Sequence, residues 1–182
     1  MASVVRRLAR SVVLIALLLT PTLLGGQSTR PFAYRGFRPG MTYTDFAERA
    51  RALAHNDVLT CQTMRSTAQV MDCGVRAHDP ADSDDFYLSA NVIDGRTSVI
   101  SLMDSGGVAL VKRIQDDMRR QLGSTQRRGR GMWEWTSGRG RRFIRFNWRG
   151  RANWRVISIT LNDRDVMDRI RRYRPAPKKR TP

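Results

Sequence analysis

The sequence predicts an α+β fold: an antiparallel sheet of about seven strands in two helix-plus-meander halves, with the helices on one face. Three observations support this prediction. Apolar residues recur at helical spacing in some segments and alternate with polar residues in others. The alternating segments are short and are joined by tight turns, which makes neighbouring strands antiparallel. The order of segments, a helix followed by strands, occurs twice along the chain.

The first half, residues 40–104, begins with a helix capped by Thr42. Asp45 lies in the first helical turn, where the helix dipole favours a carboxylate. Strands are expected at 58–65, 68–77, 86–92 and 99–103. Residues 78–84 are expected to form a polar loop, and Asp94-Gly95 is typical of a two-residue hairpin turn.

The second half, residues 107–174, begins with a helix over 108–122 that ends at Gly123. Residues 124–131 are expected to form a basic loop. Three strands are expected at 132–137, 141–148 and 152–162, and a short helix at 164–173 closes the half. Residues 175–182 are rich in proline and basic side chains, which predicts a disordered tail.

The N-terminal segment, residues 1–28, has the layout of a secretory signal. Arginines precede a short apolar run, and small residues near Gly26 to Ser28 offer a cleavage site. This predicts a periplasmic or secreted protein; the alternative is an N-terminal membrane anchor. Residues 29–39 then form a connector, whose Phe32, Tyr34 and Phe37 would pack onto the domain.

The two cysteines, Cys61 and Cys73, are expected to form a disulfide bond. An oxidising compartment favours pairing. The expected hairpin places the two residues opposite each other, and a bond closing a loop of this length adds on the order of 3 kcal/mol of stability.

Charge divides the chain unevenly. Residues 29–104 carry a net charge of −2, whereas residues 105–182 carry +16, and 30 of the 33 basic residues are arginine. Such a basic half attracts polyanions such as lipopolysaccharide, nucleic acid or acidic polysaccharide. The alternative is a solvated basic surface, with an arginine excess that follows from GC-rich coding.

The last strands suggest where a polyanion would bind. Alternation turns Ile144, Phe146 and Trp148 inward and leaves arginines with Phe143 and Trp154 on the outer face. Basic side chains interleaved with aromatic rings suit nucleic acids and sugar phosphates. The candidate polyanion-binding residues are Arg141, Arg145, Arg149, Arg151 and Trp154. The alternative is that helices cover this face, or that the arginines simply pack over the rings.

No catalytic signature, cofactor motif or metal-ligand spacing is evident, so no catalytic residue, cofactor or metal is expected. His55 and His78 are the only histidines. They would have to act together as general acid and base in a basic secreted ribonuclease, but each stands in a turn-like segment. The acidic segment with Asp79, Asp82, Asp84 and Asp85 does not have the spacing of a calcium loop.

Gly40-Met41-Thr42 at a helix start, followed by Cys61-x11-Cys73 on the next hairpin, resembles one repeat of the secreted β-lactamase inhibitor protein family. The helix–meander plan with Trp133 and Trp135 is also similar to small outer-membrane assembly lipoproteins of the SmpA/OmlA type. The resemblance implies a non-enzymatic extracytoplasmic module that presents a sheet face to a partner protein.

Three functions are therefore expected, in order of preference. The first is a secreted or periplasmic non-enzymatic binding module that contacts a protein or another macromolecule of the cell envelope. The second is an extracytoplasmic polyanion binder that uses the basic C-terminal half. The third is a basic secreted ribonuclease.

Overall fold

The structure is a computed structural model that describes residues 31–66, 69–80 and 84–172. The predicted signal segment 1–28 and the predicted tail 175–182 lie outside the described residues, as does the start of the connector. Within the described ranges, no helix is long and apolar enough to cross a membrane.

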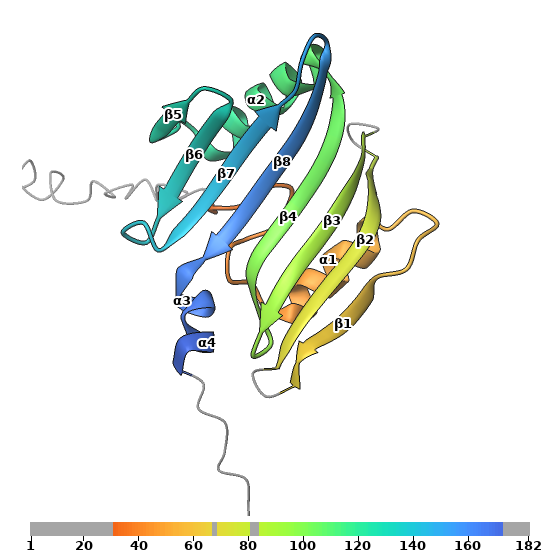
Figure 1. Ribbon diagram of the computed structural model, residues 1–182, viewed down its shortest axis with the longest axis vertical. Helices are drawn as coiled ribbons and strands as arrows, with labels where there is room; N and C mark the ends of the chain where they lie inside the picture. The colour runs from red at the N-terminus through yellow and green to blue at the C-terminus, as the bar shows by residue number, and fades with distance from the viewer. Residues whose placement is uncertain (1–30, 67–68, 81–83, 173–182) are drawn as a thin grey trace, which may run out of the picture.

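The fold is α+β, as predicted, with eight strands in one antiparallel sheet ordered β1-β2-β3-β4-β8-β7-β6-β5 (Figure 1). The strands are β1 Thr60–Arg65, β2 Val70–Asp79, β3 Asp84–Ile93, β4 Arg96–Gly107, β5 Arg127–Gly129, β6 Met132–Ser137, β7 Arg142–Arg149 and β8 Trp154–Asp163. The helices are α1 Tyr43–Leu53, α2 Val108–Leu122, α3 Arg164–Met167 and α4 Arg169–Arg172. The two meanders meet where β4 pairs with β8, so the innermost strands are the last strand of each half.

The first half follows the expected order. The Asp45 backbone N–H donates to Thr42 Oγ1 at 3.1 Å, which caps α1 as predicted. Phe46, Ala50 and Leu53 of α1 are buried against the sheet. In the first hairpin Cys61 lies opposite Cys73, and the predicted disulfide bond joins them.

The predicted polar loop over 78–84 is wrong in its extent. Strand β2 continues to Asp79 and β3 begins at Asp84, so that His78 lies opposite Asp85 in the ladder. The polar residues here do not interrupt the strands because one face of the sheet is solvated. On that face polar side chains are compatible with strand structure.

The second half also begins with its helix. Val111, Ile114 and Met118 of α2 are buried, and Gly123 ends the helix with the positive φ angle that glycine tolerates. The predicted loop over 124–131 contains a strand that the sequence did not reveal. This strand, β5, is an exposed sheet edge of three residues without apolar alternation.

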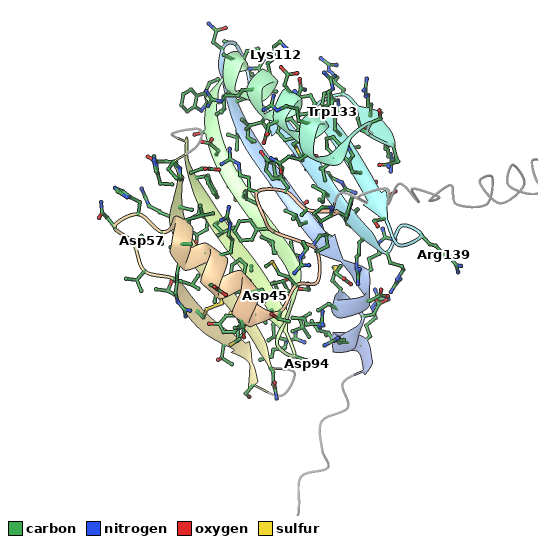
Figure 2. The ribbon with its side chains drawn as sticks, turned by 180° about the vertical axis from the view of Figure 1, so that it is seen from behind. Asp45, Asp57, Asp94, Lys112, Trp133 and Arg139 are labelled. Atoms are coloured by element: carbon green, nitrogen blue, oxygen red, sulfur yellow. A yellow bond between two sulfur atoms is a disulfide. The ribbon has the colours of Figure 1, made fainter. Side chains whose placement is uncertain are left out.

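The connector fills the space between the two helices on the covered face of the sheet (Figure 2). Tyr34 and Phe37 are fully buried, in agreement with their predicted packing. The Arg35 guanidinium lies against the rings of Tyr34 and Phe86 and pairs with Asp79 at 3.4 Å. This pairing compensates for the burial of a charge, because an unpaired ion inside a protein is strongly destabilising.

Candidate binding surface

The face of the sheet opposite α1, α2 and the connector is open except at one end, where Val166 of α3 and Ile170 of α4 pack against Val70 and Ile93 (Figures 1 and 2). Its centre consists of small polar side chains in register across β3, β4 and β8, where Ser89 lies opposite Ser101 and Ser101 opposite Thr160. We call this surface the open face. Strands in an antiparallel sheet can be solvated on one side, so a polar centre needs no covering element.

Apolar side chains nevertheless cross the open face diagonally from β3 to the start of β8. The exposed fractions are 49% for Tyr87, 45% for Met103, 50% for Val156 and 59% for Trp154. Tyr87 lies opposite Met103, and Ser105, two residues beyond Met103, lies opposite Val156. We call these four residues the apolar strip. Sequence reasoning missed the strip as a unit, although alternation alone assigns each of its members to the polar face.

Backbone features lie beside both aromatic residues of the strip, and at Tyr87 they position the ring itself. The Tyr87 hydroxyl lies over Gly74 of β2, in the space that any side chain at position 74 would fill. Trp154 stands at the end of the β7–β8 turn, where Arg155 Nη1 donates to the backbone oxygens of Ala152 and Trp154 at 2.7 and 2.9 Å. A ring held as Tyr87 is loses little conformational freedom when a partner binds.

The five predicted polyanion-binding residues separate into two groups. Arg141 binds the carboxylates of Asp165 and Asp168, and these contacts raise the pKa of its guanidinium, Asp168 having the larger effect. Arg145 donates from Nε and Nη2 to Glu134 Oε2 at 2.8 and 2.6 Å. Each of these two arginines therefore has a carboxylate partner within its own chain.

Arg149, Arg151 and Trp154 come together at the other end of β7, at the turn into β8. Arg130 stands in the neighbouring β5–β6 turn, whose Gly131 oxygen accepts from the Trp148 N–H at 3.0 Å. We call Arg130, Arg149 and Arg151 the basic tip. All three are exposed, and none forms an ion pair with another residue in the part of the chain that the structure describes.

Phe143, expected on the outer face, is half-buried beneath two arginines. The guanidinium carbons of Arg145 and Arg164 lie 5.1 and 5.4 Å from its ring centroid. At this position the packing alternative considered from the sequence is the one observed, because the cations cover the ring instead of leaving it free to stack.

His55 and His78 lie closer together than their separate turn-like segments suggested. An isolated backbone bridge between Ala54 and Ala77 brings the segment after α1 beside β2, and the two imidazole centroids are 5.5 Å apart. His78 belongs to β2, and Asp85 Oδ1 accepts from its Nδ1 at 2.8 Å. Only the fold reveals this proximity, since neither residue's neighbours in sequence predict the bridge.

In the acidic segment, the two carboxylates whose side chains are described contact separate partners. Asp79 pairs with Arg35 and Asp85 with His78. Asp82 lies outside the described residues, and the side chain of Asp84 is likewise not described. Among the residues with described positions, no three histidine, cysteine, aspartate or glutamate side chains gather in a metal-binding arrangement.

Comparison of the chain with protein-family models, with curated proteins and with solved structures gives no match. The resemblance to the secreted β-lactamase inhibitor family therefore stays a prediction.

Proposed function

We propose that the protein is a non-enzymatic binding module of the periplasm or the extracellular space, and that its open face binds a partner protein. The apolar strip carries this proposal. Tyr87, Met103, Val156 and Trp154 are all about half exposed or more, and they adjoin one another on one rigid surface. Contiguous exposed apolar side chains on a soluble domain mark interaction sites, and Tyr, Trp, Met and Arg are enriched at the centres of interfaces.

Charges on either side of the strip indicate the chemistry of the partner. Arg76 lies opposite Tyr87 in the ladder, and Arg149 lies opposite Val156. A surface with an apolar centre and basic flanks complements an apolar patch bordered by carboxylates. The basic flanks would speed association and fix its orientation, whereas burial of Trp154 and Tyr87 would supply most of the affinity.

Two observations support the proposed location outside the cytoplasm. Residues 1–28 have the layout of a secretory signal with a cleavage site near Gly26 to Ser28. The Cys61–Cys73 bond is of the kind that persists in oxidising compartments.

Quantitative affinity isolation from the producing cells tests the binding proposal. Parent protein is compared with a Tyr87→Ala/Met103→Ala/Trp154→Ala variant and with Glu48→Ala, a control on the exposed side of α1. We expect one protein to be enriched with the parent and the control and to be depleted at least tenfold with the triple variant. Equal enrichment with all three would contradict the proposal.

A second candidate function, polyanion binding, is supported by the exposed basic tip beside Trp154. Its test is binding to lipopolysaccharide, RNA and heparin across a salt series, because phosphate contacts make affinity fall steeply with salt. If this function operates, Arg149→Ala/Arg151→Ala weakens binding more than Arg141→Ala/Arg145→Ala. The latter two arginines already contact carboxylates. Binding that is insensitive to salt would count against it.

A further inference from the structure

The two imidazoles adjoin a hollow of about 500 Å³ where β2 ends, β3 begins and β4 ends. His55, His78, Asp85 and Asp104 line it, together with Arg76 and Tyr87. The bridge between Ala54 and Ala77 and the pairing of His78 with Asp85 fix the backbone on both sides of the histidines. The proximity of the two rings therefore follows from the sheet.

The hydrogen bond to Asp85 sets the tautomer in which His78 can act as a metal ligand. A carboxylate can only accept a hydrogen bond, so the contact from Nδ1 to Asp85 Oδ1 at 2.8 Å places the imidazole proton on Nδ1. Nε2 then carries the free lone pair. Metal-binding histidines usually have this arrangement, in which a carboxylate fixes the tautomer and makes the ligating nitrogen more basic.

The separation of the rings fits shared coordination of one ion. Two imidazoles bound to one tetrahedral zinc ion have ring centres about 5 Å apart, because each ligating nitrogen lies about 2 Å from the metal. The observed distance is 5.5 Å. We propose that His55 and His78 together bind a divalent ion that prefers imidazole ligands, with Zn²⁺ as the representative case and Asp85 as the positioning residue behind His78.

The charges around the hollow favour a cation over a phosphate. Asp85 and Asp104 line it. Arg76 is the one basic side chain in the lining besides the two histidines. With neutral imidazoles the lining therefore carries two carboxylates against one guanidinium. This also makes it a poor site for the phosphodiester of a ribonuclease substrate.

Two protein ligands leave two positions of a tetrahedral ion to water, so the site is open and of modest affinity. No other imidazole competes with it, because the chain has two histidines. No thiolate competes either, because both cysteines of the chain are in the disulfide. This inference does not depend on the partner-binding proposal.

Zinc titration of the untagged protein, followed by calorimetry and by NMR of the histidine ring protons, tests the site. We expect one Zn²⁺ per chain, with both histidine signals shifting together and no comparable response to Mg²⁺, which prefers oxygen ligands. His55→Ala and His78→Ala should each weaken binding at least tenfold. Asp85→Asn should weaken it about tenfold or more.

The matched control is Asp72→Asn, which removes an exposed carboxylate of β2 that contacts Asn91 and does not line the hollow. It should leave zinc affinity unchanged. The proposal is overturned if no zinc binds, if only one histidine signal responds, or if the His55→Ala/His78→Ala variant binds as well as the parent. Circular dichroism confirms that each variant is folded.

Discussion

The two halves of the sheet have the same plan but are stabilised by different chemistry. Each contributes a helix to the covered face and a meander whose last strand lies at the centre of the sheet. The first half joins its outer hairpin covalently through Cys61 and Cys73. The second half has no cysteine and instead gathers its aromatic rings around Trp133.

Arginine takes part in that aromatic cluster. The guanidinium carbons of Arg119 and Arg128 lie 4.5 and 5.2 Å from the Trp133 ring centroid, and Trp133 also contacts Trp135 and Trp148 edge to face. A flat guanidinium stacks on an aromatic face while its charge stays hydrated at the surface. Part of the arginine excess of this half is thus explained by packing.

The acidic residues of the second half show the same use of arginine. All six of its carboxylates form ion pairs with basic side chains of the same half: Asp116, Asp117, Glu134, Asp163, Asp165 and Asp168. The basic tip has no such partner among the described residues. The net charge of each half is therefore a poor guide to a binding site, and an arginine without a carboxylate partner is a better one.

The largest expected effect is loss of the aromatic core of the second half. Trp135 is fully buried, and its Nε1 donates to the Gly123 oxygen at 3.1 Å. Trp135→Ala should lower the free energy of unfolding by about 3–5 kcal/mol. Urea denaturation measures this, with the exposed Trp154→Ala as the control, expected within about 0.5 kcal/mol of the parent. Equal losses in the two variants would contradict the assigned packing.

The corresponding change in the first half is removal of the disulfide bond. Cys61→Ser/Cys73→Ser should cost about 3 kcal/mol, the value for a closed loop of this length. The same denaturation experiment with and without a thiol reductant measures it. Reductant should destabilise the parent and leave the variant unchanged; a parent indifferent to reduction would show that the bond contributes no stability.

A smaller effect is expected at the ion pair on the open face of the second half. Glu134 is buried and accepts two hydrogen bonds from Arg145, whose side chain is 38% exposed. Glu134→Gln should cost about 1 kcal/mol, since solvent screens a pair that is partly exposed. Asp116→Asn, in an exposed pair with Lys112, should cost less. A larger loss of stability for Asp116→Asn than for Glu134→Gln would argue against the stronger contribution assigned to the Glu134–Arg145 pair.

The smallest expected effect on stability is at Asp57 of the first half, and it should depend on pH. Hydrogen bonds from the backbone N–H groups of Arg76 and Val58 lower the pKa of its carboxyl in the folded protein. A lowered folded-state pKa stabilises the fold at pH above the unfolded value of about 3.9, and this contribution is lost as pH falls through the folded value. The stability difference between parent and Asp57→Asn should therefore be constant near neutral pH and shrink below about pH 4. Urea midpoints across this range measure it, and a difference that grows on acidification would contradict the cause assigned.

Local pattern sufficed to predict most of the fold. Helical spacing found α1 and α2, Asp94-Gly95 identified a hairpin turn, and alternation assigned Ile144 and Phe146 to the core, where both are fully buried. The opposed cysteines also followed from counting along two short strands. These features depend on residues close in sequence, for which spacing is informative.

Features that depend on distant residues were not predictable in this way. The residues near Arg141 in sequence do not predict its contacts with Asp165 and Asp168. The residues near His55 likewise do not predict that its ring lies beside that of His78. Strand β5 was not predicted because an exposed edge strand needs no apolar residues and so shows no alternation in the sequence. The apolar strip required knowledge of which strands are neighbours, since its four members come from three strands.

Site-specific photo-crosslinking in the producing cells shows whether the open face binds a partner protein. A photoreactive residue is placed at Met103 on the open face or at the exposed Ala52 of α1 on the opposite side. We expect a single crosslinked partner from position 103, lost when Trp154→Ala is added, and none from position 52. Crosslinks from position 52 with none from position 103 would contradict it.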